Sequence, residues 1–544
     1  MSMTLATVSC PALLTLRYQS SLADFDTYLS CTFTRTSIYS LPDDLLLLII
    51  SYVELKDILA LRKTSKRFYS MTKLRWVWYD AMKRHVIAKG LPVPAADVDL
   101  RVFSAEHLEA RAVHAAKFHD NWCSPQPKPR HSIEFHAERC LPDELPQDLK
   151  TTVKHVFFLP GRNGEFLVTV VGRVITCWEV PLDGSGAYRV AEWVSSSRVE
   201  QAVVNEDPKN EAVLTFVSEV STGPGEVELT TLSLDKFHGH FTVRNRIRGH
   251  RNSVLPLHVM DGDYVIFGDP LVVWFRTSPL DVQIIPEREV YPLVGDESNK
   301  VLVVKPINRY MLIVREREYQ LVYSPIWNGK RTVYGPAKDI SACVLTQFPA
   351  KDAVIIARSS AAASGDDEVE WPNELVTILI RCSEDGLDTI QQFDLLPAPQ
   401  SKTVQTEPSE PKEVFRVPCV FPTGSTRVLV VPPSCCKLNA GSSGKGYWIQ
   451  TWNVTSRHSE YPARCLMGFH LSSEGEGKDD AIKLQYGQPG SDLNLCQGTL
   501  YSRRCDMSEI IWKKYMIVST ALEDTVGRLA IGDRTGKVEV VDFV

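Results

Sequence analysis

The residues with the clearest potential for chemistry lie between Gly441 and Gly446, where the chain reads Gly-Ser-Ser-Gly-Lys-Gly. A glycine-rich loop that ends in lysine can hold phosphate with its backbone N–H groups. The nucleotide-binding form of this loop also needs glycine five residues before Gly444 and Ser or Thr after the lysine. Asn439 and Gly446 occupy those two positions. The sequence therefore predicts a surface loop here, not a nucleotide site.

Two other groups contain residue types that bind metals or transfer protons. They are the histidines His238, His240, His250 and His258 and the acids Asp366, Asp367, Glu368 and Glu370. A zinc site needs three or four converging ligands, and His250 is expected to have a structural role in a repeat. The acids lie in a Ser/Gly/Glu-rich run, where a fixed carboxylate separation is not expected. Because G-x-S-x-G and H-E-x-x-H motifs are also absent, we predict no catalytic residue, no metal and no cofactor.

The composition is that of an ordinary globular protein. The chain has 544 residues, 44% hydrophobic and 23% charged, and this length predicts two or more domains. The formal net charge of −6 disfavours a nucleic-acid partner, and the apolar runs are too short to predict a membrane partner. The thirteen cysteines include no C-x-x-C pair, which favours reduced thiols in a cytoplasmic and/or nuclear protein.

The segment from Ile38 to Ala81 is the most informative part of the chain. A helix should begin at Leu41 or Pro42, because proline suits a first turn and the acids that follow suit the positive end of the helix dipole. Its apolar residues fall on two adjacent stripes. One stripe contains Leu41, Leu45, Leu48, Ile49 and Tyr52, and the other contains Leu46, Ile50 and Val53. We predict that the rest of the unit covers one stripe and that a second protein covers the other.

The same residues resemble the F-box family. The family pattern starts with Leu-Pro, followed by Leu and an Ile/Leu pair. A second helix begins with Asp, and the pattern ends with Ser-Lys-Arg-aromatic and then Trp. The matching positions are Leu41-Pro42, Leu45, Ile49-Ile50, Asp57-Ile58-Leu59, Ser65-Lys66-Arg67-Phe68 and Trp78. Val53, Thr64 and Phe68 depart from the commonest residues, but none of them removes the apolar face.

The resemblance implies binding to the Skp-type adaptor of a cullin-RING ubiquitin ligase and, through it, to the cullin and RING subunits. The residues that it assigns to the adaptor contact are Leu41, Pro42, Asp43, Leu45, Ile49, Ile50, Val53, Ile58, Leu59 and Leu61. Residues 41–90 also carry ten Lys/Arg against five Asp/Glu, an excess that could steer an acidic partner. The alternative is a three-helix cap that packs only on the chain's own second domain.

From about residue 150 the pattern changes to short strands separated by turn residues. Val153–Phe157, Glu165–Val171 and Val174–Trp178 are three strands in succession, broken by glycines. Similar strand endings then recur at intervals of roughly 40 to 60 residues, which is typical of a β-propeller. These endings are Arg173–Trp178, Glu228–Leu232, Leu271–Trp274, Tyr319–Tyr323, Glu374–Ile380, Tyr447–Trp452 and Gly536–Val541. We predict about seven blades, with six or eight blades or a pair of β-sandwiches as alternatives.

One unit resembles a WD-type repeat. It contains Arg248-Gly-His250, then strands at Val254–Leu257 and Asp263–Phe267, and a third strand that ends at Trp274. Phe275 stands where that family has Asp, so the propeller is WD-like with degenerate repeats. Polar insertions between the strands are predicted to be loops. They are Ser359–Glu370, Gln400–Glu413, Gly441–Gly446 and Ser472–Asp492.

The predicted fold class is multidomain, with a small all-α F-box domain followed by an all-β propeller of about seven blades. A helix capped by Ser104 should connect the two parts. The predicted segments are a disordered leader (1–37), the F-box (38–90), a helical connector (91–122), a Pro-rich linker (123–149) and the propeller (150–544). A weak organelle-targeting peptide is the alternative for the leader.

These resemblances imply a fungal-type substrate-recognition subunit of an SCF ubiquitin ligase, which acts by proximity and does no covalent chemistry itself. A propeller scaffold outside any ligase is one alternative, and a propeller enzyme with acids converging on the channel is a more remote one. The protein substrate is not identified by the sequence. Four arginines around the Gly-His unit either bind phosphate or prevent a strand edge from pairing with another chain. They are Arg244, Arg246, Arg248 and Arg251.

Overall fold

A computed structural model describes most of the chain, in two compact units, Met1–Val53 and Glu54–Val544. The described residues are 38–93, 99–124, 127–137, 152–220, 223–235, 239–278, 282–285, 299–308, 310–323, 326–327, 330–331, 339–344, 348–357, 375–384, 387–398, 418–422, 427–431, 435–455, 460–471, 498–502 and 516–544. The predicted leader lies outside them.

The first unit contains a short 3-10 helix, η1 (Ile38–Ser40), and helix α1 (Asp43–Ser51). Pro42 is the N-cap residue of α1, and Asp43 and Asp44 occupy its first turn, as the sequence predicts. Acidic side chains at this position interact favourably with the partial positive charge of a helix N-terminus. The predicted start of the helix is therefore correct to within two residues.

The second unit begins with short helices. They are α2 (Leu55–Leu61), α3 (Lys66–Met71), α4 (Arg75–Ala81), the π-helix η2 (Met82–Ile87), the 3-10 helix η3 (Leu100–Val102) and α5 (Ala105–Trp122). Arg62 joins the end of α2 to α5, because its guanidinium donates to both carboxylate oxygens of Glu109 at 2.6 and 3.0 Å. Within the described ranges, no helix combines the length and apolar character that crossing a bilayer requires.

Helix α5 is the connector that the sequence predicts after the F-box. The Ser104 side chain caps it by accepting from the backbone N–H of His107 at 3.3 Å. Its buried face recurs at helical spacing and ends in Phe118 and Trp122, which pack against strands of the last two blades. The Trp122 indole N–H also donates to the carbonyl of Phe469 at 2.9 Å. The connector is therefore packed onto the propeller.

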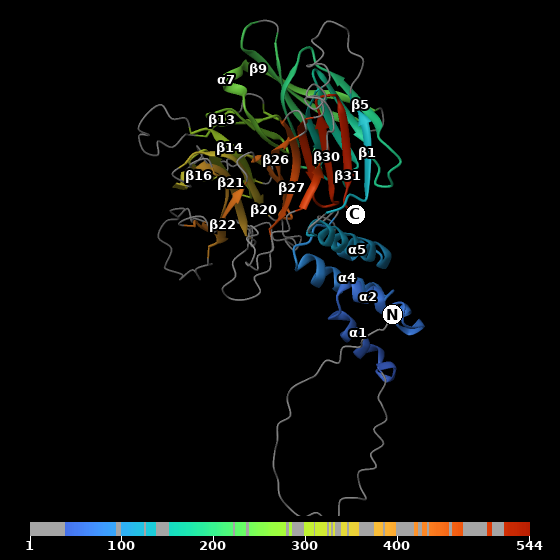
Figure 1. Ribbon diagram of the computed structural model, residues 1–544. Helices are drawn as coiled ribbons and strands as arrows, with labels where there is room; N and C mark the ends of the chain where they lie inside the picture. Colours follow the sequence, from blue (N-terminus) through green and yellow to red (C-terminus); the bar gives the residue numbers. More distant parts are fainter. Residues whose placement is uncertain are drawn as a thin grey trace, which may run out of the picture. The chain divides into compact units, whose positions relative to one another are not determined.

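The described residues after α5 form seven sheets of at least four antiparallel strands each (Figure 1). In order they are β2 (Val153–Phe158), β3 (Phe166–Val171), β4 (Val174–Glu179), β5 (Tyr188–Val194); β6 (Val199–Val204), β7 (Ala212–Glu219), β8 (Glu226–Asp235), β9 (His240–His250); β10 (Leu257–Asp261), β11 (Tyr264–Phe267), β12 (Val272–Phe275), β13 (Val282–Ile284); β14 (Val301–Ile307), β15 (Tyr310–Arg315), β16 (Glu318–Tyr323), β19 (Asp339–Val344); β20 (Ala350–Ala357), β21 (Val376–Glu384), β22 (Leu387–Pro397), β23 (Cys419–Val420), β24 (Arg427–Val431); β25 (Cys435–Ala440), β26 (Lys445–Thr455), β27 (Glu460–His470), β28 (Gly498–Ser502); and β29 (Ile517–Glu523), β30 (Arg528–Asp533), β31 (Lys537–Asp542), β1 (His131–His136). A hairpin of β17 (Ile326–Trp327) and β18 (Lys330–Arg331) and the short helix α7 (Arg251–Val254) are additional.

The first strands of the sheets form the inner ring. They contact one another in the order β29, β2, β6, β10, β14, β20 and β25. Buried apolar residues fill the spaces between adjacent sheets, as in the cluster that joins β2, β3, β30 and β31. Seven four-stranded units arranged in this way are the blades of a β-propeller, so the prediction of seven WD-like blades is confirmed.

The last blade is completed by a strand from the other end of the propeller sequence. Strand β1 pairs with β31 from His131 opposite Asp542 to His136 opposite Lys537, and Figure 1 shows the two strands side by side in cyan and red. The sequence predicts a Pro-rich linker at 123–149 and a propeller from 150, but the strand β1 within that linker belongs to the last blade. This pairing closes the ring of blades, which leaves only the short outer edges of the individual blades.

The predicted strand endings fall on two different strands of the blade. Five of the seven coincide with third strands, including β4 and β12. The described part of Glu374–Ile380 and the range Tyr447–Trp452 lie on the second strands β21 and β26. The insertion Gly441–Gly446 forms the turn between β25 and β26 and the start of β26. The predicted loops at Ser359–Glu370, Gln400–Glu413 and Ser472–Asp492 and the acidic run lie largely or entirely outside the described residues.

We expect Gly527→Ala to destabilise the packing of α5 on the propeller. Gly527 has a φ of +77°, and a Cβ there would lie 2.7 Å from the Phe118 ring. The left-handed backbone costs about 1–2 kcal/mol for alanine and overpacking adds about 1–3 kcal/mol. Gly262→Ala is the control, because its φ is +54° and its Cβ would meet only one atom, 3.9 Å away. Equal denaturation midpoints for the two variants would show that α5 does not pack against Gly527.

Candidate protein-binding surfaces

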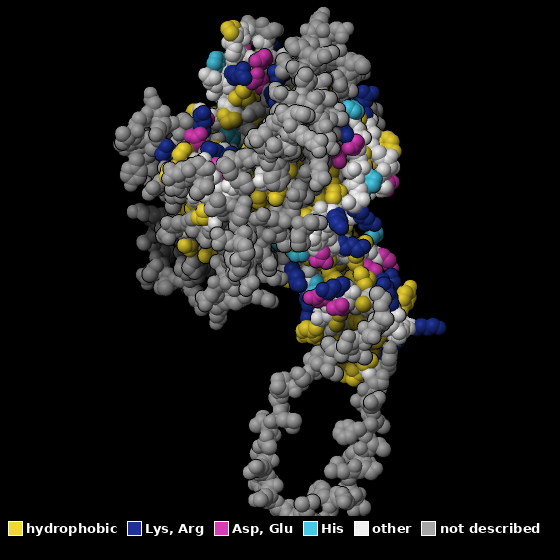
Figure 2. Space-filling model, viewed as in Figure 1, with side chains coloured by type: hydrophobic (Ala, Val, Ile, Leu, Met, Phe, Trp, Pro, Cys, Tyr) yellow, Lys and Arg dark blue, Asp and Glu magenta, His cyan; other side chains and the backbone are white. Residues whose placement is uncertain are grey.

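Helix α1 has one buried and one exposed apolar stripe. Leu46 and Ile50 are each 1% exposed. On the other stripe Leu45, Leu48, Ile49 and Tyr52 are 48%, 51%, 42% and 71% exposed. Hydrophobic side chains (yellow) reach the surface in this helical region in Figure 2. The exposed stripe predicted from helical spacing is therefore present, and we refer to these four residues as the α1 stripe.

The ten residues assigned to the adaptor contact by resemblance differ in accessibility. Four are exposed (Pro42, Asp43, Leu45 and Ile49), four are half-buried (Leu41, Val53, Leu59 and Leu61) and two are buried (Ile50 and Ile58). In this structure the two buried side chains contribute to the interior and have no surface to offer a partner. The role of the other eight stays a prediction. The assignment omits Leu48 and Tyr52, although their spacing of three and seven residues from Leu45 places them on the same stripe.

A second surface lies where the inner strands of the propeller begin. Each of the seven first strands has a break in pairing register near its start, where one extra residue is inserted. Such β-bulges change the direction of side chains at the end of a strand. The inserted residues are Lys154, Glu200, His258, Leu302, Lys351, Lys437 and Val518. We call this set the bulge ring.

The bulge ring carries both signs of charge. Burial lowers the pKa of Lys154 and of Lys437, whereas the Lys351 side chain is half exposed. Burial and the neighbouring Glu219 carboxyl raise the pKa of Glu200. Burial lowers the pKa of His258 to about 4, so its imidazole is neutral at pH 7. Three of seven positions are lysine, and this end of the propeller can therefore interact with acidic groups.

The arginines around the Gly-His unit are paired with acids. Arg244 lies 2.7 Å from Glu211, and Arg251 lies 2.6 Å from Glu200. Arg246 and Arg248 lie 3.6 and 3.4 Å from the carboxylate oxygens of Glu228. Each of these arginines has a side chain about half exposed or more. Salt bridges with this exposure stabilise a fold by about 0–1 kcal/mol, so they do not exclude a role in binding.

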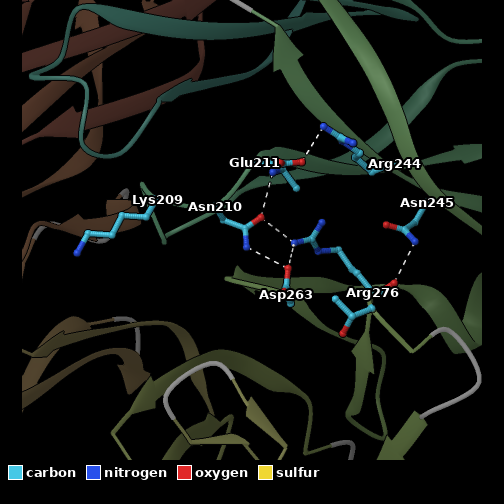
Figure 3. Close-up of a pocket in the computed structure, with 9 residues that line it drawn as sticks. Lys209, Asn210, Glu211, Arg244, Asn245, Asp263 and Arg276 are labelled. Carbon is cyan, nitrogen blue, oxygen red and sulfur yellow. Dashed lines mark hydrogen bonds and ion pairs between the residues drawn. The ribbon is translucent and has the colours of Figure 1, made fainter. Parts of the chain in front are cut away.

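A polar pocket of about 390 Å³ lies between the second and third blades (Figure 3). It is lined by Lys209, Asn210, Glu211, Ala212, Arg244, Asn245, Asp263, Arg276 and Thr277. The Arg276 guanidinium is central, because its Nη2 donates to the side chains of Asn210 and Asp263 at 2.8 and 2.7 Å. Since these bonds hold the side chain in place, Arg276 primarily joins the two blades. The remaining polar lining suits a hydrogen-bonding segment more than an apolar ligand.

The histidines considered as a metal group are not brought together. His240 and His250 occupy opposite ends of β9, and His238 lies outside the described residues. His250 instead caps α7, where its ring nitrogen accepts from the N–H of Asn252 at 3.4 Å. This structural role agrees with the expectation from the repeat.

Comparison with protein families decides the identity of the helical region. The family model described as the F-box domain matches residues 38–80. The chain contains an F-box domain. It is followed by a seven-bladed propeller, and this combination fits a non-catalytic adaptor or receptor. An F-box domain implies binding to the Skp-type adaptor, and a propeller implies protein binding.

Searches over the whole chain add little about function. No curated protein matches the sequence. Among solved structures, a crystal structure of the WD40 domain of SCAP from fission yeast matches 74% of this chain and 83% of its own chain, with 9% sequence identity and a TM-score of 0.38. The propeller fold of the F-box protein is established here by the order and pairing of its own sheets.

Proposed function

We propose that this F-box protein is the substrate-recognition subunit of an SCF-type ubiquitin ligase. The observation that carries the proposal is the α1 stripe within the F-box, because four large apolar side chains on one short helix face are exposed. Burying a fully exposed side chain of this size contributes roughly 1.5–3 kcal/mol to the free energy of binding. Because these side chains are about half exposed, each would contribute about half as much. The Skp-type adaptor would cover the stripe and recruit the cullin and RING subunits.

The proposed substrate-binding surface is the end of the propeller that carries the bulge ring. Helix α5 contacts the opposite ends of the inner strands, since His114 approaches the carbonyl of Val526, in the turn that follows β29, at 3.0 Å. The described contacts of the connector therefore lie at the end opposite the bulge ring. The lysines of this end favour a protein segment with acidic character.

The proposed mechanism is proximity. A receptor accelerates transfer by holding the substrate near a ubiquitin-charged enzyme, and the geometry must be maintained for this to be effective. Helix α5 supports such a role, because Phe118 and Trp122 are buried against the propeller and Arg62 joins α2 to α5 through Glu109. The protein would act in the cytoplasm, the nucleus or both.

The test is affinity purification of the tagged full-length protein from its own cells, beside a Leu45→Asp/Ile49→Asp variant. We expect the wild type to recover the Skp-type adaptor together with a cullin, and the variant to lose both. Proteins that the variant retains are candidate substrates bound by the propeller.

Recovery of the adaptor without cullin would contradict the ligase proposal and favour a scaffold outside the ligase. Recovery of neither by the wild type would contradict adaptor binding itself. A Leu182→Asp variant is the matched control, because Leu182 is an equally exposed leucine, at 48%, outside the F-box.

A further inference from the structure

Three metal-binding side chains meet where helix α5 ends. His119 lies in the last turn of α5, Cys123 is its C-cap residue, and His470 is the last residue of β27. Their ligand atoms all lie within 4.8 Å of one another. His119 and Cys123 are four residues apart, so they share one face of the helix, whereas His470 comes from a blade about 350 residues later in the chain. No other group of three such ligands occurs among the described residues.

We propose that His119, Cys123 and His470 bind a zinc ion that joins helix α5 to strand β27. Zinc prefers thiolate sulfur and imidazole nitrogen, and it binds them in tetrahedral geometry at about 2.3 and 2.0–2.1 Å. The fourth position would be taken by water. This inference is independent of the proposed ligase function.

The separations between the three residues are close to those of side chains that share one ion. When the angle at the ion is tetrahedral or slightly wider, these bond lengths place a sulfur ligand about 3.6–3.8 Å from a nitrogen ligand. They place the ring centroids of two imidazole ligands about 5 Å apart. The Cys123 sulfur lies 3.8 Å from each ring nitrogen of His119, so it faces the ring midway between them, and the ring must rotate to direct one nitrogen at a shared ion. The His119 and His470 ring centroids are 5.0 Å apart.

The site is held in place by its neighbours in the chain. Trp122, next to Cys123, donates to the carbonyl of Phe469, which is next to His470. Asn121 donates to the carbonyl of Phe543 at 2.6 Å. These bonds fix the helix end against the blade, so the backbone that carries the ligands stays in place while the side chains rotate. A preorganised site binds more tightly because less conformational entropy is lost.

Two lysines, Lys445 and Lys89, act electrostatically on His119. The same two lysines oppose a cation at the site. Zinc binding therefore requires the Cys123 thiol to lose its proton, because the thiolate offsets part of the positive charge.

The test is zinc content of the full-length protein, purified under reducing conditions and dialysed against a weak chelator. We expect about one zinc ion per chain in the wild type, and about tenfold less in His119→Ala, Cys123→Ser and His470→Ala. His107→Ala, on the exposed surface of α5, and Cys436→Ser, in β25, are the controls and should keep the metal.

A second measurement separates loss of metal from loss of fold. Zinc should raise the apparent Tm of the metal-depleted wild type and of both controls, because a ligand that binds only the folded state stabilises it. It should not raise the Tm of the three ligand variants, and magnesium should have no effect on any protein. The proposal would be overturned if the wild type held no more zinc than the triple variant, or if zinc raised the Tm of ligand variants and wild type equally.

Discussion

Replacing Leu45 and Ile49 with aspartate should weaken binding of the Skp-type adaptor by at least about 100-fold, which corresponds to about 2.7 kcal/mol. Both side chains are close to half exposed, so burying the rest contributes about 1 kcal/mol each. Each aspartate would in addition bring an unpaired charge into an apolar contact, which costs several kcal/mol more. The measurement is the Kd of the purified adaptor for the full-length protein.

The exposure of the two residues makes this variant informative. Because both side chains already lie on the surface, circular dichroism and the apparent Tm should stay close to those of the wild type. Leu182→Asp, in the propeller, changes an equally exposed leucine and should leave the Kd unchanged. An adaptor Kd that the double variant changes by less than threefold would exclude the α1 stripe as the adaptor contact.

Arg528→Ala should cost about 3–5 kcal/mol of stability, the largest effect that we expect from a single substitution in the propeller. Arg528 is fully buried, and its guanidinium forms a bidentate pair with Asp542 at 2.6 and 3.0 Å. It also donates to the carbonyls of Gly164 at 2.9 Å, of Val180 and of Pro181. One side chain thus joins the last blade to the first, and its loss leaves a buried carboxylate without its partner.

Chemical denaturation of the variant tests this role. Arg189→Ala is the control, because Arg189 makes an ion pair of similar length, 2.9 Å to Glu192, with a side chain that is 51% exposed. That exposed pair is expected to contribute less than about 1 kcal/mol. The variant Arg528→Met/Asp542→Leu should be less destabilised than Arg528→Ala, since it removes both charges. Equal midpoints for Arg528→Ala and Arg189→Ala would contradict a role in ring closure.

Features that depend on local spacing could be predicted from the sequence. The two stripes of α1 follow from a period of 3.6 residues, and the structure buries Leu46 and Ile50 and exposes Leu45 and Ile49 accordingly. The cap at Ser104 follows from the preference of serine for the first N–H groups of a helix. The strands of the first blade follow from apolar runs between glycines, and β2, β3 and β4 match them to within one residue.

Features that join distant parts of the chain could not be predicted in this way. Strand β1 is separated from β31 by about 400 residues, and nothing in its short sequence specifies that partner. The zinc ligand His470 is likewise about 350 residues from His119. Only the spacing of His119 and Cys123 on one helix face was available as a signal.

The bulge ring is an intermediate case. An ordinary strand alternates with period two, whereas β2 is buried at Val153 and then at Val156. The same spacing of three separates Val301 from Val304 and Cys435 from Leu438. This spacing is visible in the sequence. It can be interpreted as a bulge at the surface of the propeller only when it is known which strand of each blade is innermost. Spacing therefore predicts elements, and the assembled ring shows which surface they form.

The most direct test of the proposed receptor role is the ubiquitylation of propeller-bound proteins in cells that express either the wild type or Leu45→Asp/Ile49→Asp. Proteins captured by both forms bind independently of Leu45 and Ile49, so the two forms differ in recruitment of the ligase. We expect these proteins to carry ubiquitin chains with the wild type and to lose most of them with the variant. Equal ubiquitylation with the two forms would contradict the proposed receptor role.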